Sequence, residues 1–245
     1  MATLLFYNNP IPLDKKKHNA LKLVRQNGYN FTQNTNSVPV AGFEFFECSR
    51  HFPIFFIKQS DDSYLPLAIL SLRKSGNDLG DTWQDVYVPS YVRRYPFVLS
   101  TDGLVLIDSE ATHFSEEDGD PLFANEEGEP SETLKEIVQF LETVDRSYKA
   151  TEEFCKALAE KDMIEPFNRN LKVDNTSLDM RDLYIINERK MHENLSEAEV
   201  ADWFRKGWIA WAHAQLHSLG AVNQVVKRAH DAGVNPFDEP SAAAN

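Results

Sequence analysis

The densest group of side chains able to do chemistry combines three tyrosines with two adjacent arginines. It consists of Tyr87, Tyr91, Arg93, Arg94 and Tyr95, within the segment YVPSYVRRYPF. A guanidinium can bind a carboxylate or a phosphate through two parallel N–H donors. Neighbouring residues of a helix point to different sides, so at most one of the two arginines is expected to be buried. The group predicts either a site for a ligand or partner, or an internal ion pair with the acidic stretch that follows.

Two histidines near the end of the chain have the spacing of metal ligands. His213 and His217 are four residues apart, which places both imidazoles on one helix face. A third ligand would have to come from elsewhere, with His51, His113 or Asp202 as the choices. The residues around the pair are apolar, which favours histidines packed in the core or in an interface. The sequence therefore assigns no metal, and His213 and His217 are the candidate ligands if a metal binds.

Tryptophans gather on the same predicted helix. Trp208 and Trp211 lie on adjoining faces, with Trp203 about one turn earlier. Core packing explains such a group. The alternative is the wall of an aromatic pocket, because tryptophan offers both a flat ring and an N–H donor. Trp208, Trp211 and His213 are accordingly a second candidate binding face.

The sequence contains no recognised catalytic motif. A Gly-rich phosphate loop, a GxSxG turn, HExxH and an EF-hand loop are all absent, and Cys48 and Cys155 form no CxxC. With 38 acidic residues, no pair of carboxylates stands out as an acid–base pair. The sequence thus favours a non-catalytic protein without a cofactor, with two buried thiols in a reducing compartment.

Charge and hydropathy argue against two kinds of partner. The formal net charge is −13, whereas binding to a nucleic-acid backbone needs a basic face. Eleven acidic residues lie against one lysine in 108–136, which is typical of a solvated acidic loop. No run of about 20 apolar residues occurs, so membrane insertion is not expected. The first apolar run, 4–7, is too short for a signal peptide, which predicts a cytoplasmic location.

The first half of the chain must position these side chains through short strands and helices. Apolar runs around polar turns predict two hairpins, and segments with phenylalanine or proline at suitable positions predict two short helices. The predicted hairpins are 53–58 with 64–72, and 96–100 with 104–108. The predicted helices are 41–50 and 88–96.

The second half has mainly the helical period. An apolar stripe predicts a helix from 131 to about 161. The capping box of Ser196 and Glu199 begins another helix, which should run to Leu219 and end at Gly220. The remaining predicted elements are a hairpin, 171–173 with 178–186, and a helix, 222–230.

These elements predict an α+β fold. We expect an antiparallel sheet with short helices in the N-terminal half, packed against a mainly helical C-terminal half. One domain should cover 1–235, followed by a flexible tail over 236–245. The alternative is two lobes, 1–110 and 131–232, joined by the acidic loop.

The segment 87–97 resembles the signature block of the SapC family, bacterial proteins of about this length. Similar pieces follow nearly the whole chain. These pieces are Pro12-Leu13 with His18, His51-Phe52-Pro53-Ile54, Leu65-Pro66-Leu67-Ala68, Asp120-Pro121-Leu122-Phe123, Gly128-Glu129-Pro130 and Ala212-His213-Ala214-Gln215-Leu216-His217-Ser218-Leu219. By this resemblance, the family has a histidine at the position of His213 and none at that of His217, which speaks against a metal pair.

The resemblance implies no catalytic residue. The family's name comes from an association with a bacterial surface layer, and other members are similar to proteins encoded beside flavin-dependent tryptophan halogenases and outer-membrane receptors. We therefore expect a non-catalytic binding or accessory protein for a peptide, a protein or a small aromatic ligand, with a flavin-dependent halogenase-like enzyme as one expected partner. The alternatives are a component of a flavin- or metal-linked enzyme system acting on tryptophan or peptides, and a structural surface-layer protein.

Overall fold

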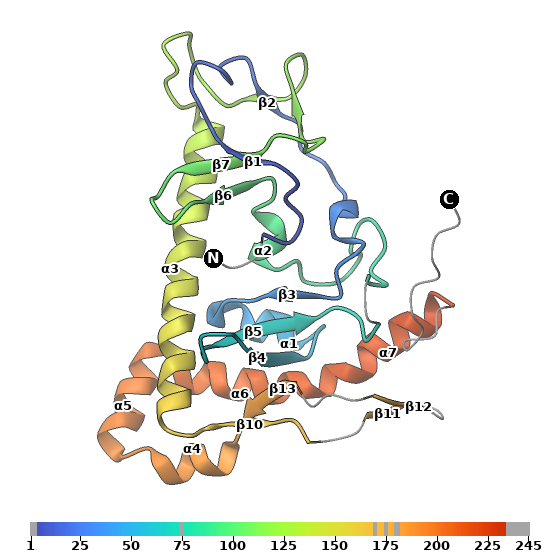
Figure 1. The fold of residues 1–245 in the computed structure, drawn as a ribbon, viewed down its shortest axis with the longest axis vertical. Coiled ribbons are helices and arrows are strands. Elements are labelled where there is room, and N and C mark those ends of the chain that lie inside the picture. Colours follow the sequence, from blue (N-terminus) through green and yellow to red (C-terminus); the bar gives the residue numbers. More distant parts are fainter. Residues whose placement is uncertain (1–3, 74–75, 169–170, 174–175, 179–181, 234–245) are drawn as a thin grey trace.

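A computed structural model describes residues 4–73, 76–168, 171–173, 176–178 and 182–233. Its strands pair in antiparallel sheets, and its longer helices lie in the C-terminal half (Figure 1). The predicted α+β class is confirmed. The tail expected to be flexible, 236–245, lies outside the described residues.

The secondary structure changes from short strands to long helices along the chain. The helices are α1 (Phe45–Ser49), α2 (Ser90–Arg93), α3 (Glu132–Glu160), α4 (Glu188–Asn194), α5 (Glu197–Lys206), α6 (Trp208–Ser218) and α7 (Val222–Asp231). Short 3₁₀ helices cover Asn30–Thr32, Gly42–Glu44 and Leu219–Ala221. The strands are β1 (Pro10–Pro12), β2 (Lys22–Leu23), β3 (Ser37–Pro39), β4 (Ile54–Lys58), β5 (Tyr64–Ile69), β6 (Phe97–Leu99), β7 (Val105–Asp108), β8 (Phe114–Ser115), β9 (Asp120–Pro121), β10 (Ile164–Pro166), β11 (Leu171–Val173), β12 (Thr176–Leu178) and β13 (Leu183–Ile186).

The largest sheet has the strand order β10-β13-β4-β5-β3. Its centre is the predicted hairpin of β4 and β5, in which Phe56 pairs with Pro66. Successive side chains of a strand point to opposite faces. Ile54 and Phe56 accordingly join the main hydrophobic cluster, whereas Phe55 packs against Phe167 on the other face. Both faces are covered, which explains why the sequence of β4 is almost continuously apolar.

Two smaller sheets lie at the other end of the molecule. One has the order β1-β7-β6 and contains the second predicted hairpin, in which Phe97 pairs with Ile107. The other has the order β8-β2-β9 and draws β8 and β9 from the acidic stretch. The acidic stretch is therefore part of the folded body.

Helix α3 connects the two ends of the molecule (Figure 1). Ser131, where the sequence predicts that the helix begins, caps it by accepting the Leu134 N–H. Leu134 and Leu141 pack in a smaller hydrophobic cluster with β6 and β7, whereas Phe154 and Leu158 pack in the main cluster. One helix thus forms a wall for both clusters. The choice between one domain and two lobes stays a prediction.

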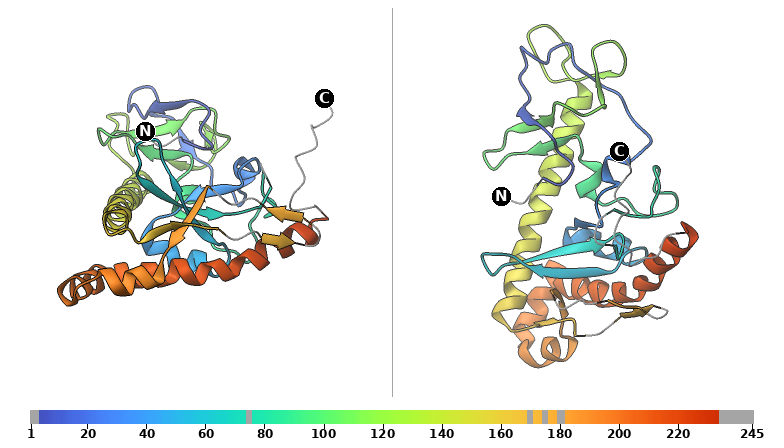
Figure 2. Two further views of the ribbon diagram at one scale, coloured as in Figure 1. Left: turned by 60° about the horizontal axis from the view of Figure 1, so that its bottom comes forward. Right: turned by 45° about the vertical axis from the view of Figure 1, so that its right-hand side comes forward.

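Helices α5, α6 and α7 follow one another in a row (Figure 2), and α6 contacts α1, β4 and β13. The sequence predicted an unbroken helix from 196 to 219, which is wrong. Gly207 has a φ of 77°, in the left-handed region, and separates α5 from α6. On a straight helix, Trp203 and Trp208 would lie about 140° apart. The break brings their ring centroids to 5.3 Å, both buried.

Two further details of the second half differ from prediction. Gly220 does not end a helix in the left-handed conformation but lies in the 3₁₀ turn Leu219–Ala221, which leads into α7. Strand β11 pairs with β12, so the predicted hairpin is present with a shorter second strand, whereas β13 joins β10 and β4. The turn residues predicted for that hairpin, 174–175, lie outside the described residues. In the described part of the chain, no helix has both the length and the apolar character needed to span a membrane.

Gly42 lies where the chain comes closest to Trp211 of α6, so a substitution at Gly42 tests this contact. A Cβ added at Gly42 would lie 2.3 Å from Cε3 of Trp211, and that ring is held by Phe45 and Phe154. We expect Gly42→Ala to lower the free energy of unfolding by about 1–3 kcal/mol, measured by urea denaturation. Gly220→Ala is the matched control, because its Cβ meets nothing within 4 Å, and it should change stability by less than about 0.5 kcal/mol. Equal midpoints for both variants would contradict this packing.

Candidate functional site

The arginine–tyrosine block, residues 87–97, is anchored by the buried carboxylate of Glu44. Oε1 of Glu44 accepts hydrogen bonds from the Ser90 N–H at 2.6 Å and from the Tyr87 hydroxyl at 2.7 Å. Oε2 accepts from the Ser90 hydroxyl at 2.6 Å. Ser90 is the first residue of α2, and the preceding proline has no side chain that can cap it. Glu44 therefore caps α2 from a distant segment, and burial together with its hydrogen bond raises the pKa of Tyr87.

Arg93 completes this polar group from the solvent side. Its Nη2 lies 3.6 Å from Oε1 of Glu44, and its side chain is 42% exposed. Its guanidinium also lies over the rings of Phe140, at 5.3 Å, and Tyr87, at 5.8 Å. The ion pair predicted for the block therefore exists, but the prediction that its partner comes from the acidic stretch is wrong. Glu44 holds Arg93 because it lies directly under α2.

Arg94 turns to a different side of α2. Its guanidinium stacks over the buried ring of Tyr91, with Cζ 4.1 Å from the ring centroid. The Tyr91 hydroxyl accepts the N–H of Leu5 at 3.1 Å, which ties the start of the described chain to the block. Nε of Arg94 is buried and has no hydrogen-bond partner in the described part of the chain. The two adjacent arginines thus diverge, as the sequence predicts.

A second buried carboxylate, Asp108, holds the end of the block. It accepts hydrogen bonds from the N–H groups of Asn8 and Asn9, at 3.0 and 2.9 Å, and from the Tyr95 hydroxyl at 3.0 Å. Burial alone would raise the pKa of Asp108, but the backbone N–H groups of Asn9 and Asn8 outweigh it and lower the pKa. Burial and the charge of Asp108 raise the pKa of Tyr95.

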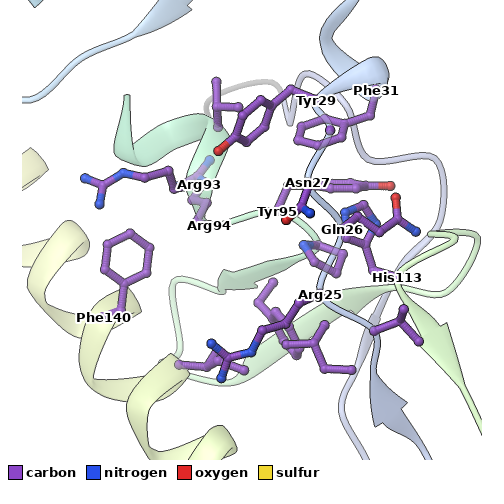
Figure 3. A pocket seen from close by; sticks show the side chains of 17 residues that line it. Arg25, Gln26, Asn27, Tyr29, Phe31, Arg93, Arg94, Tyr95, His113 and Phe140 are labelled. Atoms are coloured by element: carbon purple, nitrogen blue, oxygen red, sulfur yellow. The ribbon is translucent and has the colours of Figure 1, made fainter. Parts of the chain in front are cut away.

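A pocket of about 360 Å³ opens beside the block. Its walls come from the segment 23–31, from residues 92–97, from His113 and from Ile137 and Phe140 of α3 (Figure 3). Leu23 and Phe97 belong to the smaller hydrophobic cluster, whereas Phe31 and Val92 belong to or pack against the main one. The pocket therefore lies where the two hydrophobic clusters meet, a common place for ligand sites.

One wall of the pocket is aromatic. Phe31 and Tyr95 are stacked, with centroids 4.2 Å apart and an interplanar angle of 26°. His113 meets both rings edge-on, at 5.8 Å from Phe31 and 5.2 Å from Tyr95. Figure 3 shows Phe140 on the other side of the pocket from Tyr95 and His113. Aromatic side chains therefore lie on two sides of the pocket.

The charge of the pocket is opposite to that of the protein. Arg25, Arg93 and Arg94 line it, and none of the described lining residues is an Asp, a Glu or a Lys. Arg25 pairs with Asp120 at 2.9 Å, near the surface. Burial lowers the pKa of His113, so its imidazole is neutral at pH 7, and its Nδ1 has no hydrogen-bond partner among the described residues. The arrangement can neutralise an anion.

The five residues of the predicted block divide into two roles. Arg93, Arg94 and Tyr95 line the pocket. Tyr87 and Tyr91 lie behind them, where one binds Glu44 and the other supports Arg94. The structure thus gathers the whole block around one place, with three of its residues in the pocket lining.

The second predicted face, Trp208 to His213, lies elsewhere and does not line this pocket. Trp208 is buried against Phe154, and Trp211 packs over Gly42. The tryptophans are therefore core residues. His213 and His217 are exposed, so the prediction that they pack in the core is wrong. No group of three metal-ligating side chains occurs among the described residues.

Several residues of the site were missed in the sequence, or, like His113, were named there only as a possible metal ligand. They are Arg25, Phe31, Glu44, Asp108, His113 and Phe140. Glu44 carried a weak signal, because it is one of two acids in the phenylalanine-rich run GFEFFEC, where a buried charge would need a partner. Asp108 carried none, since it stands at the start of a stretch with many acids.

The fold and the site define a class: an α+β protein whose arginine- and aromatic-lined pocket lies between two hydrophobic clusters. The family model described as SapC matches residues 13–225, which include every described residue lining the pocket. The chain belongs to the SapC family. No curated protein and no solved structure matches it.

Glu44 offers a test of the anchor. Glu44→Gln keeps the shape of the side chain but places an N–H₂ group against the donors of Tyr87 and Ser90. We expect a loss of about 2–4 kcal/mol in the free energy of unfolding, measured by urea denaturation. Glu47→Gln, on the exposed side of α1, is the matched control and should cost less than about 1 kcal/mol, because it breaks only the surface pair with Arg50. A stable Glu44→Gln protein would show that the carboxylate is not the anchor.

The lowered pKa of Asp108 predicts that the protein loses stability in acid as this carboxylate becomes protonated. Its folded pKa lies below the ordinary 3.8, so its contribution to stability is fully present well above pH 3.8 and is lost as the pH falls through the folded value. We expect Asp108→Asn to be less stable than the parent at pH 7, with a smaller further loss between pH 5 and pH 2. Chemical denaturation across this range measures both slopes. Parallel slopes for parent and variant would contradict the assignment.

Proposed function

We propose that this chain is a non-catalytic binding protein, and that it holds a small anionic ligand in the pocket beside the arginine–tyrosine block. The observation that carries the proposal is the charge of the pocket. Three arginines and no acid line it within the described residues of a protein whose net charge is −13. A guanidinium stays protonated at any physiological pH. An anion can therefore bind more favourably here than a cation.

The size of the pocket supports a small molecule as the ligand. A volume of about 360 Å³ lies at the small end of the range of ligand sites, about 300–1,000 Å³. Apolar and aromatic side chains make up most of the wall, with a few polar groups among them. That composition is typical of sites that enclose most of a ligand.

Arg93 is the residue best placed to bind the anion. Its side chain is 42% exposed, and its guanidinium lies over Phe140, another lining residue, at 5.3 Å. Glu44 and Tyr87 engage its Nη2. A guanidinium has further N–H donors on its other two nitrogens, which an anionic ligand can engage.

The lining also supports a role in binding rather than in catalysis. The described lining residues include no Ser, Thr, Cys, Asp, Glu or Lys. Of the groups that transfer protons near neutral pH, the described lining offers His113 alone. An acid–base pair with separated pKa values would need a second group.

The wider expectations from the sequence stay predictions. They are a peptide or protein partner, an accessory role beside a flavin-dependent halogenase-like enzyme, and a cytoplasmic location. The alternatives of an enzyme component and of a surface-layer protein also stay open. A ligand-binding pocket fits an accessory role, because such a protein can present a small molecule to a partner.

The test compares the binding of small anions with that of a small cation. We expect acetate, phosphate and benzoate to shift the Arg93 Nε–H signal in NMR spectra of the full chain, and benzylammonium to leave it unchanged. Arg93→Gln should abolish binding measured by calorimetry. Arg146→Gln, which replaces an exposed arginine of α3 outside the pocket, should bind as the parent does. Binding of benzylammonium, or of anions to Arg93→Gln as to the parent, would overturn the proposal.

A further inference from the structure

Helix α5 has an apolar face that the rest of the described chain leaves uncovered. Phe204 is the most exposed large apolar side chain of the described residues, at 76%, and Val200, about one turn earlier, is 44% exposed. Together with the exposed Glu197 and Ala201 they form the α5 face. Trp203 anchors the inner side of the same helix in the main hydrophobic cluster. We propose that the α5 face binds a second copy of this chain, with the two α5 helices antiparallel in a twofold-symmetric dimer.

The α5 face has the spacing of a helix that packs along another helix. Its four residues follow one another at intervals of three and four, which places them on one side of α5. Packed helices have their axes about 8–10 Å apart, depending on the side chains at the contact. The small Ala201 permits a close approach at the middle of the face. Val200 and Phe204, before and after it, then leave water, which is favourable for apolar surface.

The charges of α5 indicate which partner this face fits. Glu199, Asp202 and Lys206 are engaged in ion pairs within the chain. Glu197 and Arg205 are exposed and have no ion-pair partner among the described residues. The helix therefore presents one free acid near its start and one free base near its end, beside an apolar centre.

Antiparallel pairing with a second copy joins these two charges. Glu197 lies four residues before Ala201, and Arg205 lies four residues after it, which is about 6 Å of helix in each direction. When the twofold axis passes beside Ala201, Glu197 of each copy lies level with the partner's Arg205, so that two ion pairs form. A parallel pair would instead place like charges level with each other. The same charges also suit the dipole of each single helix, so a decisive experiment must exchange charges between copies.

The position of α5 leaves its face open to a second molecule. Figure 1 shows α5 at the edge of the molecule. Two copies with a net charge of −13 repel each other, but at physiological salt the repulsion is screened beyond about 8 Å. One helix pair is a small interface, and small interfaces are weak. We therefore expect a dissociation constant in the micromolar range.

Analytical ultracentrifugation of the full chain in physiological salt, from about 1 to 500 µM, measures this equilibrium. Phe204→Glu should raise the dissociation constant about 100-fold or more, because the new charge would be buried between the helices. Its exposure in the single chain means that the variant should fold normally. Leu104→Glu is the matched control. Leu104 is 56% exposed and lies beside β7 at the other end of the molecule, so this variant should dimerise as the parent does.

Exchange of the two charges tests the antiparallel arrangement. Glu197→Arg places two arginines level in each pair, and Arg205→Glu places two glutamates level. Each variant alone should have a dissociation constant about tenfold higher than the parent. An equimolar mixture of the two variants should dimerise about as tightly as the parent, because both pairs of the mixed dimer again join an acid to a base.

A chain that stays monomeric up to about 500 µM would overturn the proposed dimer. A Phe204→Glu variant that dimerises like the parent would also overturn it. If the mixture of the two charge variants is no tighter than either variant alone, the antiparallel arrangement is wrong. All these outcomes leave the anion-binding function intact, because no residue of the α5 face and neither charged partner lines the pocket.

Discussion

A carboxylate taken out of water must be surrounded by donors, and Glu44 imposes this condition on the centre of the molecule. Its donors come from residues up to 46 positions away in the sequence, at the start of α2. Glu44 is itself fixed to α3, because the N–H of Gly42 in the same 3₁₀ turn donates to Thr151 at 2.8 Å. The position of α2 relative to α3 depends on this one buried charge. Arg93 at the end of α2, Arg94 directly after it and the opposite wall of the pocket are thereby set at a fixed separation.

The same principle explains how an acidic protein contains a cationic pocket. The two buried acids next to the arginine–tyrosine block, Glu44 and Asp108, are engaged by hydroxyl and backbone donors and do not line the pocket. The acids of the stretch 108–136 that remain lie mainly at the surface, where Asp120 pairs with Arg25. The described lining contains arginines and no acid, because the acids that pair with Arg25 and Arg93 lie outside it.

The pocket owes its position to the packing of two hydrophobic clusters on one helix. Helix α3 contributes to both, and the segment 23–31 passes from one to the other. Two clusters built around different sheets leave a gap where they meet, and arginines fill its rim because their long stems pack on apolar surface while their heads stay hydrated. The N-terminal segment closes the back of the block through bonds from Leu5 to Tyr91 and from Tyr7 to Phe97.

The sequence by itself determined what depends on neighbours along the chain. The hairpins of β4 with β5 and of β6 with β7, the cap of α3 and the capping box at Ser196 all follow from residues a few positions apart. The sequence did not predict the helix break at Gly207, because glycine is tolerated both within a helix and in a left-handed turn. Only the burial of both Trp203 and Trp208 decides in favour of the turn. Tertiary structure alone decided the partners of the block. Asp108 accepts a hydrogen bond from the N–H of Asn8, 100 residues away. No local sequence pattern predicts which donors will surround a buried charge.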